Sequence, residues 1–443
     1  MNQQKPNQEL YNLVESIMAE ARRQGATAAE AEIGTGTGLA VTARLGELEK
    51  LEHERDKGLG VTVYMDHRKG TASSSDFSTD AIRETVTAAC NIARYASEDP
   101  CSGLADAGLL VRDVPMLDIN YPWQLTPEAA TQMAIECETA ARDCNSRIRN
   151  SDGCMVNTYA GEHVYGNSND FIGGWCWSVH MLDCTVIAGD EKGMQRDGWY
   201  SKVRDPDDLE STQSVGREAA RRTLARLGSR QLSTRQCPVI YEAPVASSLF
   251  SPFLTAVSGS ALYRGASFLK DSLGQPVFAD HVQINEQPHL AKALGSAPFD
   301  NDGLPTRNRD IVLDGVLQTY LLSVYSARRL KMQPTGHAGG VHNLVVESGG
   351  DSLDDLIREM NTGLLITDMI GFGVNQVTGD YSRGASGYWV ENGELLYPVE
   401  EITVAGNLRD IYKKILKVAN DVDTRGNIRT GSVLIETMTV AGN

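Results

Sequence analysis

The chain has 443 residues, of which 41% are hydrophobic and 22% charged, and its formal net charge is -17. That length exceeds what one ordinary hydrophobic core organises, so we expect two or three domains. The acidic balance lacks the basic face of a nucleic-acid-binding protein, which argues against direct contact with nucleic acid. No apolar run approaches the roughly 20 residues that a membrane helix needs, so no membrane contact is expected.

The eight cysteines are scattered along the chain, and no two of them form a Cys-x-x-Cys pair. This pattern resembles neither a zinc ribbon nor a disulfide framework. The polar residues at the N-terminus contain no apolar signal core. We therefore expect reduced, mostly buried thiols and a cytoplasmic location.

The first part of the chain predicts helices that flank a run of strands. An amphipathic stripe over residues 10–24 predicts a helix that ends at Gly25. Short alternating runs between residues 31 and 74 fit half-buried antiparallel strands. Ser78 is placed to cap a helix that continues to Tyr95.

The next part of the chain predicts a similar series of helices and strands. An irregular stretch over residues 98–122 leads to a helix over 127–144, with Pro127 at its first position. Strand-like runs follow between residues 147 and 203, and residues 205–227 predict a helix.

The C-terminal half also mixes strands with helices. Helices are expected over residues 245–257, 353–361 and 407–418. Asp314-Gly315 and Glu391-Asn-Gly393 have the glycine that hairpin turns require.

These patterns predict an α+β fold with large mixed or antiparallel sheets flanked by helices, because strands come in runs and do not alternate with helices. We expect an N-terminal domain over residues 1–228, which could consist of two similar units over about 1–120 and 121–228. A C-terminal domain is expected over residues 229–443.

Glycine and polar residues are densest between Pro334 and Glu394. Such glycine density predicts tight turns or a close approach of the backbone to a ligand. His337 and His342 are five residues apart, which suits neither one helix face nor one strand face. A loop could still bring them together, as turn-bonding histidines, as substrate contacts, or as a metal set completed by Asp380 or Glu347.

Asp380 and Arg383 stand between glycines in Gly379-Asp-Tyr-Ser-Arg-Gly384. An aspartate and an arginine so placed could clamp a peptide or a carboxylate group. The alternative is an Asx-type turn beside a solvated arginine.

Other catalytic motifs are incomplete. His53-Glu54 has no second histidine at zinc-binding spacing, and no Gly-x-Ser-x-Gly hydrolase elbow occurs. Ser267 and Lys270 match Ser-x-x-Lys, but no companion motif follows.

Two glycine runs, Gly34-Thr-Gly-Thr-Gly38 and Gly58-Leu-Gly60, faintly resemble phosphate-binding loops. Neither completes Gly-x-Gly-x-x-Gly between a strand and a helix. Hairpin turns explain them better.

Longer motifs cover almost the whole chain. They are Gly58-Leu-Gly-Val-Thr-Val-Tyr64, Pro334-Thr-Gly-His-Ala-Gly-Gly-Val-His-Asn343, Gly379-Asp-Tyr-Ser-Arg-Gly-Ala385, Val390-Glu-Asn-Gly-Glu394 and Ile402-Thr-Val-Ala-Gly-Asn-Leu408. In these motifs the chain closely resembles the PmbA (TldE) branch of the TldD/TldE peptidase family.

The resemblance implies a division between two kinds of subunit. TldD-type chains carry His-Glu-x-x-x-His and a distant cysteine as zinc ligands, and TldE-type chains pair with them and lack that set. The family is associated with the cleavage of peptides and unfolded segments, and an older name calls its members modulators of DNA gyrase.

The zinc motif can be carried over onto this sequence from Tyr263-Arg-Gly-Ala-Ser267. The His-Glu-x-x-x-His positions then fall near Phe250, Ser251 and Thr255, none of which is a zinc ligand. Pro252 is a further departure from the family pattern, because it stands where the region of the general base should be helical. The cysteine position falls near residues 423–431, which contain no cysteine.

The resemblance therefore implies a non-catalytic subunit without a metal or cofactor of its own, with zinc in a TldD-type partner and an extended or unfolded peptide as substrate. Expected substrate contacts are His337, Gly339, Gly340, His342, Asp380 and Arg383. Alternatives are a hydrolase that is active alone, through His337, His342 and Asp380 or through Ser267 and Lys270, and a regulator linked to DNA gyrase. A homodimer is also possible.

Overall fold

The structure is a computed structural model and describes residues 5–191 and 193–442. Its N-terminal part consists of two units with the same element order, a helix, three strands and a helix. The first contains α1 (Gln8–Arg23), β1 (Ala28–Arg44), β2 (Glu47–Met65), β3 (Arg68–Ser74) and α2 (Thr79–Tyr95). The second contains α3 (Pro127–Arg142), β4 (Ile148–Asn167), β5 (Phe171–Asp190), β6 (Gly193–Val203) and α4 (Thr212–Ala225). Short 3₁₀ turns lie at Ala107–Leu109 and Pro206–Asp208.

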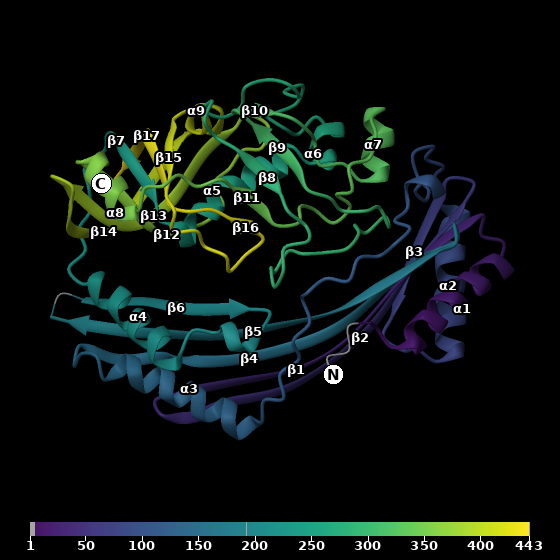
Figure 1. The fold of residues 1–443 in the computed structure, drawn as a ribbon, viewed down its shortest axis with the longest axis horizontal. Helices are drawn as coiled ribbons and strands as arrows, with labels where there is room; N and C mark the ends of the chain where they lie inside the picture. Colours follow the sequence, from purple (N-terminus) through teal and green to yellow (C-terminus); the bar gives the residue numbers. More distant parts are fainter. Residues whose placement is uncertain (1–4, 192, 443) are drawn as a thin grey trace.

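The two units share one long antiparallel sheet in the order β3-β2-β1-β4-β5-β6. The seam between them is the β1–β4 pair, which runs from Glu30 opposite Asn167 to Ala43 opposite Cys154. Figure 1 shows the sheet as a long curved layer, with α1 and α2 near one end and α3 near the other.

Each pair of helices covers its own end of the sheet. Strand alternation sends every second side chain of β1 to the helix face. Ile33 is thereby buried against α1 and α2, and Val41 against α3 and α4. The sheet is continuous, but its apolar core is divided into two clusters.

The glycine runs of the first unit are not hairpin turns, and that prediction is wrong. Gly34–Gly38 lies inside β1 and Gly58–Gly60 inside β2, both paired in register with neighbouring strands. In β1 the reason is packing, because the ring of Tyr159 occupies the space where a side chain at Gly36 or Gly38 would lie. Glycine here lets an aromatic ring lie flat on the sheet.

Two predicted helices are shorter than expected. The helix predicted over residues 205–227 begins only at Thr212, where the side chain of Ser211 caps it. The helix predicted over 407–418 ends at Lys413, and Ile415–Val418 forms strand β15.

The C-terminal part holds two further sheets, so the α+β prediction is confirmed. Its helices are α5 (Ala243–Ala256), α6 (Gly259–Tyr263), α7 (Val324–Leu330), α8 (Leu353–Met360) and α9 (Leu408–Lys413). A five-stranded sheet has the order β10 (Val316–Leu317), β9 (Arg309–Leu313), β8 (Ile284–Glu286), β11 (Leu344–Val346) and β16 (Ile428–Arg429). A six-stranded sheet has the order β14 (Glu394–Asn407), β13 (Asp380–Glu391), β12 (Gly363–Ile370), β7 (Arg235–Tyr241), β17 (Val433–Ala441) and β15. Pairing of β14 with β17 closes five of these strands into a ring.

The C-terminal part lies over the long sheet on the side away from α3 (Figure 1). Arginines bridge the two parts: Arg204 at the end of β6 donates to the carbonyl of Leu294, and Arg328 of α7 donates to the carbonyl of Leu104. Among the described residues, no helix has the length and apolar character required to cross a membrane.

Candidate functional site

A cavity of about 510 Å³ opens at the C-terminal end of α5. It brings together residues from four stretches that are distant in sequence: the α5–α6 junction (254–260), the start of α7 with the turn before it (321–326), the loop after Gly336 (337–341) and Asn427. Its lining is Leu254, Thr255, Ser258, Gly259, Ser260, Leu321, Ser323, Ser326, His337, Ala338, Gly339, Gly340, Val341 and Asn427.

Helix α5 carries the positions that the resemblance aligns with zinc ligands. Phe250 is fully buried in the core of the C-terminal part. The hydroxyls of Ser251 and Thr255 donate to helix carbonyls one turn back, at 3.2 Å in each case. These side chains leave the positions without a zinc donor set, since such a site needs imidazole, thiolate or carboxylate groups.

Pro252 does not interrupt α5, and the helix predicted over residues 245–257 is confirmed. The helix runs from Ala243 to Ala256 with Pro252 inside it. The proline ring is buried with Phe253 against the core, so tertiary packing outweighs the lost backbone hydrogen bond.

The segment at residues 423–431, where the resemblance places a cysteine, also reaches the cavity. It contributes Asn427 to the lining. Arg425 in the same segment donates to the carbonyl of Tyr200, and its guanidinium lies 4.0 Å from the ring centroid of Trp199. The loop is therefore held against β6 of the long sheet.

The glycine-rich loop needs glycine for two separate reasons. Gly339 and Gly340 have φ angles of +98° and +115°, which side chains rarely adopt. A Cβ at Gly339 would lie 2.8 Å from the amide nitrogen of Asn301. At Gly340 nothing lies within 4 Å of that position, so the loop presents bare backbone to open space.

Below the loop, two histidines share one buried carboxylate. Glu286 Oε2 lies 2.9 Å from His337 Nε2, and Glu286 Oε1 lies 3.2 Å from His342 Nδ1. The backbone N–H of His342 donates to the same Oε1 at 2.8 Å, and Arg309 lies 3.4 Å from Oε2. Thr335 Oγ1 lies 2.8 Å from the other nitrogen of His337, which fixes the plane of the ring.

The charge of this cluster follows from its contacts. Burial alone would raise the pKa of Glu286, but hydrogen bonds from His337 and His342 and the charge of His337 outweigh it and bring that pKa to about 2. Burial lowers the pKa of His337, against the opposing effect of Glu286. Glu286 is therefore an anion at neutral pH, and both of its carboxylate oxygens contact residues of the glycine-rich loop.

A second buried carboxylate holds the same loop. Asp300 Oδ2 accepts the backbone N–H of Ala338 at 2.9 Å, and Oδ1 accepts from Asp302 and Leu304. Burial, followed by the charge of Asp302, raises the pKa of Asp300 to about 6. Sequence reasoning missed both Glu286 and Asp300, because nothing near either residue marks it as a partner of the loop.

The predicted contact residues fall into three groups. His337, Gly339 and Gly340 line the cavity, and His342 is tied to Glu286 beside it. Asp380, at the start of β13, accepts from Thr378 and Asn407. Arg383 of the same strand donates to the carbonyl of Gly371, so each of these two side chains is hydrogen-bonded to a residue of a neighbouring loop.

The alternative catalytic sets are not assembled. Asp380 is not the carboxylate that joins His337 and His342, because Glu286 occupies that place. The described residues contain one group of three or more histidine, cysteine or acidic side chains whose donor atoms all lie within 4.8 Å of one another. That group lies in the second N-terminal unit and includes neither His337 nor His342. Ser267 is buried and donates to the carbonyl of Ala256 at 2.6 Å, whereas Lys270 is exposed.

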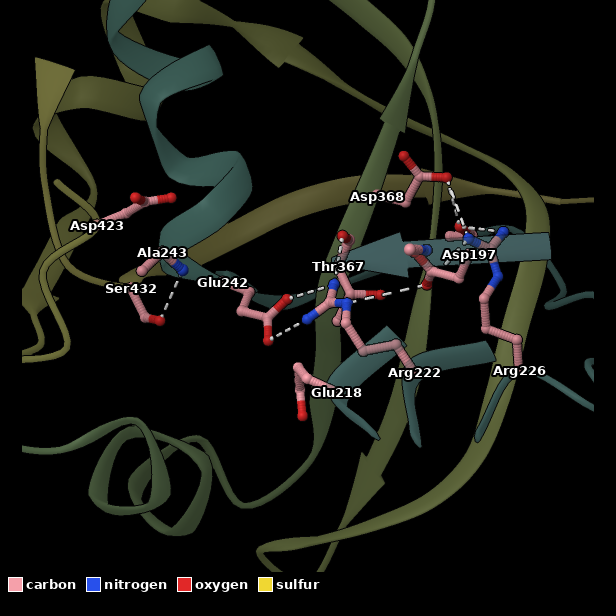
Figure 2. Close-up of polar contacts among 12 residues, drawn as sticks. Asp197, Glu218, Arg222, Arg226, Glu242, Ala243, Thr367, Asp368, Asp423 and Ser432 are labelled. Atoms are coloured by element: carbon pink, nitrogen blue, oxygen red, sulfur yellow. Dashed lines mark hydrogen bonds and ion pairs between the residues drawn. The ribbon is translucent and has the colours of Figure 1, made fainter. Parts of the chain in front are cut away.

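A buried ion-pair network fixes the other end of α5. Arg222 of α4 forms a two-pronged pair with Glu242, the N-cap residue of α5, at 3.1 and 3.0 Å. Arg226, one turn on, pairs with Asp197 and with Asp368. Figure 2 shows these arginines reaching from α4 to the C-terminal part, so the orientation of the cavity helix depends on the long sheet.

Three family models together match most of the chain. They are described as PmbA/TldA metallopeptidase domain 1 over residues 29–93, the central domain over 120–227 and the C-terminal domain over 234–442. The chain is 47% identical over 414 residues to Metalloprotease PmbA of Escherichia coli O157:H7, covering 94% of this chain and 92% of that protein. The chain belongs to the PmbA/TldE branch of the TldD/TldE family.

Further members of the family agree with this assignment. A Metalloprotease PmbA homolog of Haemophilus influenzae is 46% identical over 439 residues, covering 98% of this chain and 97% of that protein. A crystal structure from Bacteroides thetaiotaomicron, described as a candidate modulator of DNA gyrase, matches with a TM-score of 0.94 at 27% identity over 99% of this chain and 100% of that one. TldE from Thermococcus kodakarensis shares the fold, with a TM-score of 0.85 at 18% identity over 97% of this chain and 100% of that one.

Proposed function

We propose that this chain is the non-catalytic subunit of a two-subunit zinc peptidase and that its cavity receives extended peptide. One observation carries the proposal. The cavity lies at the end of α5, which carries the positions that the resemblance aligns with the family's zinc ligands, yet Phe250, Ser251 and Thr255 offer no zinc donor set. A zinc ion that activates water needs three protein ligands, so a TldD-type partner would have to supply them.

The lining suits a main chain more than a particular side chain. Ser258, Ser260 and Ser326 contribute hydroxyls, and Gly340 contributes backbone with open space beside it. Hydroxyls and backbone groups pair with peptide N–H and C=O groups whatever the peptide sequence, and strand-like peptides commonly bind in this way. The cavity would thus tolerate many unfolded segments. Asp380 and Arg383 remain predicted contacts, at a place outside this lining.

The test compares the purified chain alone, a TldD-type partner alone, and their mixture. Cleavage of an unstructured peptide and zinc content are measured in each. We expect zinc and cleavage with the mixture, and neither with this chain alone. Stoichiometric zinc and cleavage by this chain alone would contradict the proposal.

A cavity-filling variant tests the role of the lining. Ser260→Trp places a large ring at an exposed cavity position, and it should reduce cleavage by the mixture at least fivefold with the subunits still associated. Ser16→Trp is the matched control, because Ser16 is an exposed helical serine on α1, away from the cavity. Equal activity of the two variants would refute peptide binding in this cavity. A cytoplasmic location and self-association stay predictions.

A further inference from the structure

Three thiols meet in the core of the second N-terminal unit. Cys137 lies on α3, Cys154 on β4 and Cys184 on β5, and their sulfur atoms all lie within 4.8 Å of one another. The register places Cys154 directly opposite Cys184. All three side chains are fully buried. Three separate elements thus point their thiols at one position, far from the cavity described above in both sequence and fold.

The spacing suits a single ion. Metal–sulfur bonds of about 2.3 Å in a trigonal plane place the sulfur atoms about 4 Å apart. We propose that Cys137, Cys154 and Cys184 form a binding site for one soft monovalent metal ion of the copper(I) class. The proposal is independent of the peptidase function.

The identity of the ion follows from the number and kind of donors. Thiolates select soft ions such as copper(I) and zinc, and disfavour calcium and magnesium. Structural zinc takes four ligands, and catalytic zinc keeps an open position for water. Among the described residues, no histidine or carboxylate joins the three sulfur atoms, and the three cysteines are fully buried. A three-coordinate ion fits better.

The surroundings isolate these donors. Neighbours in the same cluster are aliphatic, including Val156 and Leu182. The carboxylate of Glu138, next to Cys137 in sequence, is committed to the backbone N–H groups of Leu45 and Gly46, at 2.8 and 2.7 Å. Binding of an ion would release thiol protons.

The alternative is a purely structural role, in which the three cysteines act as small apolar core residues. Cys90 allows the two readings to be separated. It is fully buried on α2 in the corresponding core of the first unit, and it is the one cysteine of that cluster among the described residues. It therefore shares the burial and helical setting of Cys137 without the other thiols.

The experiment supplies copper(I), as its acetonitrile complex, to the purified full chain under anaerobic reducing conditions. After hours of incubation, which local opening of the core requires, a chromophoric copper(I) chelator competes and the protein is desalted. We expect one copper per chain to be retained, and X-ray absorption to show three sulfur neighbours. Cys137→Ser should weaken retention at least 100-fold, and Cys90→Ser should leave it unchanged.

Thermal melting shows whether a variant that retains no copper is still folded. Copper(I) should raise the Tm of the natural chain and of Cys90→Ser, but not that of Cys137→Ser; Cys184→Ala repeats the test at a second position. Loss of all copper from the natural chain to the chelator would overturn the proposal. So would equal retention by Cys137→Ser, or a copper shell with fewer than three sulfurs.

Discussion

Nε2 of His337 lies 2.9 Å from Oε2 of Glu286, and both side chains are buried. The contact joins the glycine-rich loop to β8, since the other carboxylate oxygen of Glu286 accepts the backbone N–H of His342. His337, a predicted substrate contact, therefore also helps to fix the loop that lines the cavity. Its role can be separated from catalysis by stability measurements.

Glu286→Gln should lower the free energy of unfolding by about 2–4 kcal/mol, because an amide NH₂ would face a donor where a carboxylate oxygen accepted. Chemical denaturation with the natural chain as reference measures the loss. Glu347→Gln is the matched control: that exposed side chain accepts from Asn285, and its replacement should cost less than about 0.5 kcal/mol. Equal losses would show that Glu286 has no special role.

The same carboxylate predicts a pH dependence. Its pKa is about 2 in the folded chain against an ordinary 4.5, so the unfolded chain binds more protons between these values. Its contribution, about 3 kcal/mol at 1.4 kcal/mol per pKa unit, is present above pH 4.5 and lost as the pH falls towards 2. The stability gap between the natural chain and Glu286→Gln should narrow from pH 6 to pH 3.5. A constant gap would contradict this.

Arg222→Ala should destabilise the chain by about 3–5 kcal/mol, because it leaves the mostly buried carboxylate of Glu242 without its partner. Arg221→Ala removes the adjacent arginine, whose pair with Glu218 is more exposed, and should cost about 0–1 kcal/mol. Denaturant titration measures both. Limited proteolysis should in addition show faster cleavage between the two parts of the chain only in Arg222→Ala.

Gly36→Val should cost about 1–3 kcal/mol, because the new side chain would collide with the ring of Tyr159. Gly58→Val offers the control in the neighbouring strand, since nothing lies within 4 Å of a Cβ there. That variant should change stability by less than about 0.5 kcal/mol. Thermal melting of both variants checks the difference, and similar losses would mean that strand glycine as such, and not the tyrosine, matters.

Sequence periodicity predicted most helices and the α+β class, because amphipathic stripes and caps such as Ser78 are local signals. It failed at the glycines of β1, where the cause is a tyrosine more than 100 positions away, on a strand that pairs with β1.

The site was predicted in part. The glycine-rich loop was visible in the sequence, because it occupies a contiguous motif. Glu286 was not, because its link to the loop depends on the pairing of short strands β8 and β11. The three-cysteine cluster escaped for the same reason, since the β4–β5 register decides which thiols meet.

The seam between β1 and β4 sets a limit on how the chain can be divided. Family models treat residues 29–93 and 120–227 as separate domains, yet each contributes three strands to one sheet. Either half produced alone would uncover a long strand edge with unpaired N–H and C=O groups, a template for aggregation. The two halves should therefore be produced together, because each covers the strand edge through which the other would self-associate.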